Sequence, residues 1–307
     1  MKTLALYCLI VLIWGSTWIV ITFQLGVVPP ELSVAYRFTL ASLMLFIWLL
    51  VSRRGRLVSF SLADHLSVAA QGLMLFGLNY WFVYLGSARL GSGMVAVLSS
   101  LLPIFTSINQ YVFLRQPFRW RAVVASVIGI AGVMMIFYPE LVAIAGPEGG
   151  GEGLGALFCV LAAWMASVGN IIAIRNGGRN IPILETSAWA MGYGALFMYI
   201  VVFGSGDTLT FDISFSYISS LFYLAFFGSV IAFIAYFTLG MRIGPERSSY
   251  VSVAIPVVAL GFSTVFEDYH WTFNAVVGVG LILLGNILML RRTGHAAPAA
   301  FRESSVS

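Results

Sequence analysis

Ten runs of apolar residues, each about 20 residues long, follow one another along this chain. Hydrophobic residues make up 60% of the sequence and charged residues 9%, against roughly 25% charged in soluble domains. A run of this length crosses a bilayer as an α-helix, because a helix satisfies its own backbone polar groups. We therefore expect an all-α membrane protein with ten transmembrane helices. They cover approximately residues 4–23, 31–51, 66–86, 91–113, 121–138, 154–174, 183–203, 216–240, 245–266 and 271–290.

Basic residues are unevenly distributed among the connections between these runs. With the N-terminus in the cytoplasm, 14 of the 16 Lys and Arg residues fall on the cytoplasmic side, while Arg89 lies outside and Arg37 within a span. Because Lys and Arg stay on the cytoplasmic side during insertion, this pattern supports ten spans and places both termini in the cytoplasm. The net charge of +4 follows from this topology, and no nucleic-acid partner is expected.

The two halves of the chain carry the same motifs 153 positions apart. Ser99-Ser100-Leu101-Leu102-Pro103 corresponds to Ser252-Val253-Ala254-Ile255-Pro256. Each half has five spans, so the second half enters the membrane from the opposite side, which predicts inverted repeats around a central cavity. The expected parts are a first repeat (1–138), a Gly-rich outer connector (139–153), a second repeat (154–290) and a disordered cytoplasmic tail (291–307).

Pro103 and Pro256 fall near the middle of the fourth and ninth spans. A proline has no N–H to bond the carbonyl four residues earlier, so each half frees a carbonyl, at Ser99 or Ser252, beside a hydroxyl. Polar groups at this depth need partners. Two interpretations stay open: these four residues line a solute pathway, or they are structural kinks satisfied by neighbouring helices.

Several aromatic side chains lie deeper in the spans than the interfacial positions that Trp and Tyr usually occupy. Buried indole and phenol groups need hydrogen-bond partners. A group of them suits either the wall of a pocket for a flat organic solute or a packed core. The candidate cavity residues of this kind, with one neighbouring amide, are Trp14, Trp18, Asn79, Tyr80, Tyr84 and Trp164.

Ionisable residues are rare within the spans. Arg37 lies two turns into the second span, where it contacts a substrate carboxylate, has a structural role, or snorkels with its side chain to the interface. Glu185 begins the seventh span and is expected to reach cytoplasmic water. No metal-ligand cluster or nucleophile–base pair is recognisable in the sequence, so neither an enzyme nor a cofactor is expected. This favours movement of a solute down its gradient, with proton-coupled antiport and a small-solute channel as alternatives.

Three glycines of the tenth span, Gly278, Gly280 and Gly285, suit close approach of another helix. That helix belongs either to the same chain or to a second copy, so the oligomeric state stays open.

These motifs, in this order, resemble the drug/metabolite transporter superfamily in its EamA-type ten-helix branch. The resemblance covers residues 4–290 and implies a basket of ten helices in a bacterial inner membrane. It implies a cavity lined by spans one, three, four, six, eight and nine, with Tyr80, Tyr84 and Trp164 at aromatic cavity positions. It also implies a small-molecule substrate, because the most similar members export aromatic amino acids. The motifs are Ile13-Trp14-Gly15-Ser16-Thr17-Trp18, Tyr36-Arg37-Phe38, Ala88-Arg89-Leu90-Gly91, Arg242-Ile243-Gly244-Pro245 and Phe266-Glu267-Asp268.

The chain departs from that family in one place. Members often have a Glu after the fourth helix, where this chain has Leu114-Arg115-Gln116-Pro117. An acidic residue stands at the corresponding place of the second half, Glu267. No energy-coupling role is therefore expected at this position of the first half.

Overall fold

The computed structural model describes residues 2–52, 59–90, 92–116, 120–136, 138, 142, 150–179, 181–206, 208–266 and 271–290. All the regular elements within these ranges are helices. The first half contains α1 (Lys2–Thr22), α2 (Pro30–Ser52), α3 (Leu62–Gly72), η1 (Leu73–Leu78), α4 (Asn79–Ser87), α5 (Ser92–Ser99), α6 (Leu102–Leu114) and α7 (Trp120–Ile136). The second half contains α9 (Gly150–Gly178), α10 (Ile183–Gly204), α11 (Phe215–Ala225), η2 (Phe226–Ile231), α12 (Ala232–Ile243), α13 (Pro245–Ser249), α14 (Val251–Phe266) and α15 (Phe273–Leu290).

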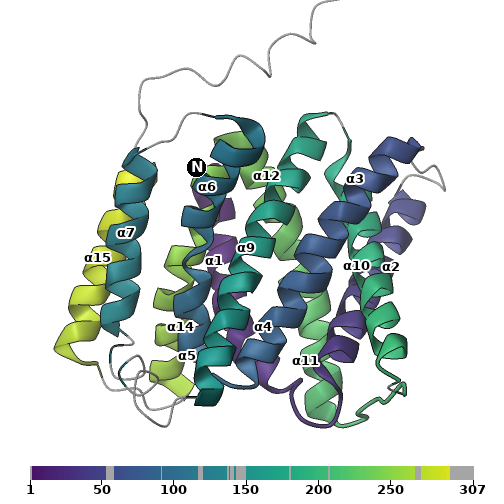
Figure 1. The fold of residues 1–307 in the computed structure, drawn as a ribbon, viewed down its shortest axis with the longest axis horizontal. Coiled ribbons are helices and arrows are strands. Elements are labelled where there is room, and N and C mark those ends of the chain that lie inside the picture. Colours follow the sequence, from purple (N-terminus) through teal and green to yellow (C-terminus); the bar gives the residue numbers. More distant parts are fainter. Residues whose placement is uncertain are drawn as a thin grey trace, which may run out of the picture.

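These helices build the ten expected spans, which stand side by side as one bundle (Figure 1). Six spans are continuous helices long and apolar enough to cross a membrane. The fifth and tenth, α7 and α15, are shorter apolar helices, and the fourth and ninth are each divided in two, as α5–α6 and α13–α14. The predicted all-α fold with ten spans is confirmed.

Corresponding helices of the two halves pair at both ends of the bundle. α7 lies beside α15 at one end, and α2 lies beside α10 at the other (Figure 1). Glycines let α7 and α15 touch through their backbones: a Cβ on Gly132 would lie 2.5 Å from the Gly278 carbonyl oxygen, and a Cβ on Gly278 equally close to the Gly132 oxygen. Gly278 therefore packs within the chain, while Gly280 meets nothing within 4 Å.

Spans three and eight each contain a π-helical segment, and the two segments occupy corresponding positions. η1 covers Leu73–Leu78 and η2 covers Phe226–Ile231, again 153 positions apart. π-Helical segments are rare and frequently occur at functional sites, because the irregular turn reorients backbone and side chains. Spans three, four, eight and nine thus all depart from a regular α-helix, and all four are among those expected to line a cavity.

The two prolines are placed differently in their spans. Pro103 lies in the first turn of α6, directly after the break at Ser100 and Leu101. Pro256 lies inside α14, and the ninth span breaks earlier, at Tyr250. The prolines correspond in sequence, but the helix breaks do not.

The sixth span starts earlier than expected. α9 begins at Gly150, inside the segment predicted to be a Gly-rich connector. The rest of that connector, apart from Val142, and the predicted tail (291–307) lie outside the described residues.

Candidate functional site

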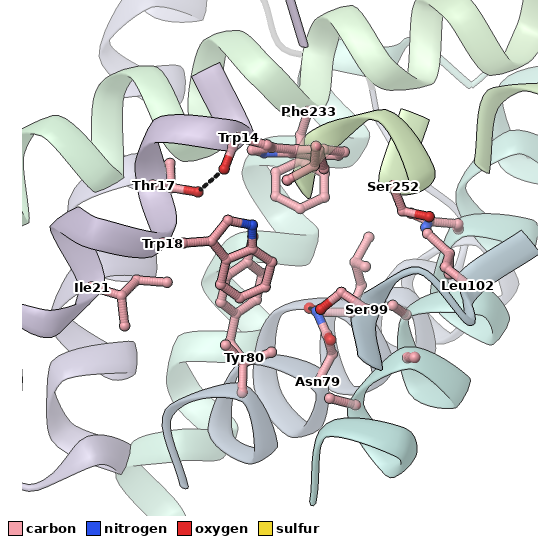
Figure 2. Close-up of a pocket in the computed structure, with 17 residues that line it drawn as sticks. Trp14, Thr17, Trp18, Ile21, Asn79, Tyr80, Ser99, Leu102, Phe233 and Ser252 are labelled. Carbon is pink, nitrogen blue, oxygen red and sulfur yellow. Dashed lines mark hydrogen bonds between the residues drawn. The ribbon is translucent and has the colours of Figure 1, made fainter. Parts of the chain in front are cut away.

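A pocket of about 100 Å³ lies between spans one, three, four, six, eight and nine (Figure 2). One water needs roughly 10–15 Å³ on this measure, so the pocket has room for several. The same six spans are those that the family resemblance implies around a cavity. Six of the candidate site residues line the pocket: Trp14, Trp18, Asn79, Tyr80, Ser99 and Ser252.

The pocket lies where the two halves of the chain meet. Four pairs of lining residues are related by the shift of 153 positions, so each half contributes the same positions to the pocket. The pseudo-two-fold axis of the repeat therefore passes close to the pocket. The pairs are Thr17 with Asn170, Tyr80 with Phe233, Ser99 with Ser252, and Leu102 with Ile255.

The walls of the pocket differ in side-chain size. One wall is aromatic: the rings of Trp14 and Phe233 meet edge to face, with centroids 5.0 Å apart, and Trp18 and Tyr80 lie below them in Figure 2. α9 contributes small side chains instead, including Ala162 and Ala166. Aromatic walls and small residues together suit a flat apolar solute.

The π-helical segments direct backbone carbonyls toward this region. Trp14 donates from its indole Nε1 to the Gly228 carbonyl oxygen in η2 at 3.1 Å. Asn79 donates from Nδ2 to the Leu75 carbonyl oxygen in η1, also at 3.1 Å. Leu75 and Gly228 correspond in the repeat. The same carbonyl of each half is thus bonded by a side chain that lines the pocket.

The paired serines present hydroxyl groups on opposite sides of the pocket. Ser99 donates to the Val95 carbonyl at 2.8 Å, and Ser252 donates to the Ser249 carbonyl at 2.9 Å. The Ser252 carbonyl, freed by Pro256, accepts the Ser100 hydroxyl at 3.4 Å. This freed carbonyl is therefore bonded by the other half, while both serine oxygens keep lone pairs for a solute.

Two polar atoms of the pocket residues are buried without a hydrogen-bond partner: Nε1 of Trp18 and Oδ1 of Asn170. An unpaired buried polar atom costs about 1–3 kcal/mol. Both atoms are closed off in this conformation, so a solute with one acceptor and one donor can satisfy them only when neighbouring side chains move. No described residue of the pocket carries a charge at neutral pH.

Four of the candidate residues do not line this pocket. Tyr84 is fully buried behind it, and Pro103 and Pro256 lie in neighbouring turns. Trp164 is 39% exposed, and its indole donates to Asn109 Oδ1 at 3.3 Å. The indole of Trp164 therefore connects α9 to α6. The aromatic wall of the pocket is formed by residues of spans one, three and eight.

Arg37 is fully buried, so of its expected alternatives the one in which its side chain snorkels to the interface is wrong, while a structural role and a carboxylate contact stay open. Its Nε donates to Ser229 Oγ at 3.0 Å, and the guanidinium lies 4.4 Å from the ring centroid of Tyr80. The carboxylate of Glu185 is also buried, at 1% exposure, and does not reach water as expected. A second buried carboxylate, Glu246, accepts the Ser107 hydroxyl at 3.3 Å. Among the described residues, no cluster of three His, Cys, Asp or Glu side chains suits a metal ion.

Several lining residues are absent from the candidates predicted from sequence. Thr17, Asn170, Phe233 and the alanines of α9 carry no individual signal in an apolar helix. The repeat points to one of them, because Phe233 is the counterpart of the candidate Tyr80, whereas Thr17 and Asn170 are counterparts only of each other. The shift of 153 positions, applied to each candidate in turn, would have found Phe233.

The comparisons of this chain with known proteins agree on one family. The sequence model of the EamA-like transporter family matches residues 1–138 and 153–291, one match in each half. An uncharacterized transporter of Archaeoglobus fulgidus is 26% identical over 95% of this chain and 100% of its own length. The uncharacterized inner membrane transporter YedA of Escherichia coli is 28% identical over 92% of this chain and 91% of its own.

Two further similarities concern a named relative and the fold. Protein PecM of Dickeya dadantii is 25% identical over 93% of both chains. A solved crystal structure superposes with a TM-score of 0.72 at 17% identity, covering 94% of this chain and 96% of the other. At that identity the likeness concerns the fold alone.

Proposed function

Because the chain belongs to the EamA-like transporter family, we propose that it exports aromatic or other hydrophobic amino acids, or similar small metabolites, across the bacterial inner membrane by alternating access. The family makes the chain a membrane transporter and not an enzyme. The substrate class rests on one observation, an uncharged aromatic pocket at the meeting point of the two halves. The sequence resemblance to YddG, an exporter of aromatic amino acids, supports the same class.

The polar groups of the pocket suit the neutral overall charge of an amino acid. Trp18 Nε1 offers a donor, and Asn170 Oδ1 and the two paired serines offer acceptors. The ring of the solute lies between the aromatic wall and the alanines of α9. Trp14 and Phe233 then contact the ring edge to face, an arrangement worth about 0.5–1.5 kcal/mol beyond burial.

Purified protein in liposomes tests this function directly. Aromatic amino acids trapped inside are expected to leave faster than from liposomes without protein, and Trp18→Ala is expected to slow that efflux at least about tenfold by removing the pocket wall. Efflux is measured with radiolabelled tryptophan, phenylalanine and alanine. Absence of movement across a broad panel of solutes contradicts the proposal.

Alternating access is supported by the asymmetry of the pocket. Trp18, Ile21 and Val83 line it, but their counterparts in the second half, Ile171, Ile174 and Tyr236, do not. Most of the lining residues that do not belong to a symmetric pair lie toward one end of the bundle. It is the end at which α1 and α4 finish and α9 begins. If the two halves exchange conformations, the pocket opens toward the other end, past Ile174 and Tyr236.

A pair of corresponding cysteines tests this exchange. In a chain with Cys8→Ser and Cys159→Ala, Trp18→Cys, at a half-buried position that lines the pocket, is expected to react with a soluble thiol reagent in the conformation described here, and Ile171→Cys, at the buried counterpart, in the opposite one. A transported substrate shifts the population, so it should change the two labelling rates in opposite directions. Labelling is followed by mass spectrometry. Parallel changes at both cysteines contradict the exchange.

Movement down the solute gradient follows from the absence of charge in the described pocket lining. The buried carboxylates Glu185 and Glu246 favour a second candidate, proton-coupled antiport, because intramembrane carboxylates commonly carry protons. An imposed pH gradient separates the two mechanisms: it drives uphill movement of the amino acid only in the antiporter.

A further inference from the structure

Arg37 is the one Lys or Arg side chain of the described residues that is buried. Its Nη1 has no hydrogen-bond partner, its Nε bonds the Ser229 hydroxyl, and its guanidinium lies against the rings of Tyr80 and Phe38. None of these groups carries negative charge. A guanidinium buried without a counter-charge is costly, since burial removes its hydration. Such a residue in a membrane span commonly marks a ligand or ion pathway.

The second half of the protein shows that the fold does not require this group. The counterparts of Arg37, Ser229 and Tyr80, 153 positions away, are Ala190, Phe76 and Phe233. All three are apolar, and the helices there still pack closely: a Cβ on Gly72 would lie 2.3 Å from the Ala190 carbonyl oxygen. The same architecture is therefore built with apolar side chains in one place and with a buried charge in the other. This comparison argues against a purely structural role for Arg37.

Tyr80 connects this charge to the pocket. Its ring contacts the guanidinium and also lines the pocket, so displacement of one side chain brings Arg37 to the solute. The described pocket lining supplies hydrogen-bond donors and acceptors but no positive charge of its own. Among the described residues, Arg37 is thus a buried cation in direct contact with a side chain of the pocket wall.

We propose that Arg37 binds the carboxylate of the transported amino acid once Tyr80 moves aside, and thereby selects carboxylate-bearing aromatic solutes over the corresponding amines. This inference rests on the proposed export of aromatic amino acids. A guanidinium suits the role because its N–H groups bind both oxygens of a carboxylate. The free Nη1 supplies one of these bonds without breaking the bond from Nε to Ser229.

Competition binding to the purified full-length protein tests the proposal. Radiolabelled tryptophan is bound and displaced by unlabelled tryptophan or by tryptamine, which lacks the carboxylate. In the wild type, displacing the label with tryptamine is expected to take about a 10- to 100-fold higher concentration than displacing it with tryptophan. This is the effect of one or two charge-assisted hydrogen bonds. In Arg37→Gln the two ligands are expected to compete equally, and Arg37→Lys, which keeps the charge, restores part of the preference. Arg89→Gln, an exposed arginine, serves as the control and keeps the wild-type ratio.

The ratio of the two affinities separates the outcomes. A structural role for Arg37 predicts that Arg37→Gln weakens tryptophan and tryptamine together, which overturns the proposal. Equal affinities in the wild type overturn it as well, and this measurement needs no variant to fold. If tryptophan leaves wild-type liposomes but the affinities are equal, only the role of Arg37 is wrong. If tryptophan neither binds nor moves, the export function and this inference are both wrong.

Discussion

Ala166→Trp is expected to stop transport while leaving the protein folded. Ala166 lines the pocket from α9, and an indole there occupies space in a pocket of about 100 Å³. A solute cannot share that space, so efflux should fall at least about 100-fold, well beyond the effect of removing one contact. The measurement is efflux of labelled tryptophan from liposomes, normalised to the amount of inserted protein.

A matched control lies on the same helix. Leu157 is 52% exposed on the outer face of α9, so Leu157→Trp introduces the same side chain outside the pocket. It should keep wild-type efflux. Normal transport by Ala166→Trp would show that the solute passes elsewhere, and equal loss in both variants would point to damage to α9 itself.

Gly278→Leu is expected to destabilise the pairing of α7 and α15. The two backbones touch at this glycine, where any Cβ would lie 2.5 Å from the Gly132 carbonyl oxygen. Backbone cannot move aside as a flexible side chain can, so the helices must separate, at a cost of about 1–3 kcal/mol or more. Thermal unfolding of the purified protein in detergent should therefore begin at a lower temperature.

Gly280→Leu is the matched control, because Gly280 lies two residues away on the same helix with nothing within 4 Å. Its unfolding temperature should stay close to that of the wild type. Equal unfolding temperatures for the two variants would show that the close contact of α7 and α15 does not contribute to stability.

The spans and their number follow from the sequence because the bilayer imposes one length on every crossing helix. The faces of those helices do not follow in the same way. Lipid and protein interior are both apolar, so a span such as α9 has no polar face to mark its exposed side. The depth of Trp164 predicts a place in the cavity wall but cannot show which way the side chain faces, and its indole bonds Asn109. The π-helical segments, too, have no composition that distinguishes them from ordinary apolar helix.

The candidate site was predicted best where the repeat and a polar group coincide. Ser99 and Ser252 are an example. A hydroxyl within a span needs a hydrogen-bond partner, and the same hydroxyl at the same depth in both halves indicates a site that the halves share. Arg37 was harder to place. Snorkelling requires a free path to the interface, and the packing of Tyr80 and Ser229 that closes this path is a property of the folded bundle.

The paired π-helical segments also carry information about ancestry. η1 and η2 hold the same irregular turn at positions 153 apart, although their sequences, Leu73–Leu78 and Phe226–Ile231, have diverged. Two independent origins at one register are less economical than a single origin before the gene was duplicated. The ancestor was then a five-helix protein that already carried this turn, and two copies inserted in opposite directions formed the transporter. On the same reasoning, the asymmetry between Arg37 and Ala190 arose after the duplication, when the two copies became free to evolve separately.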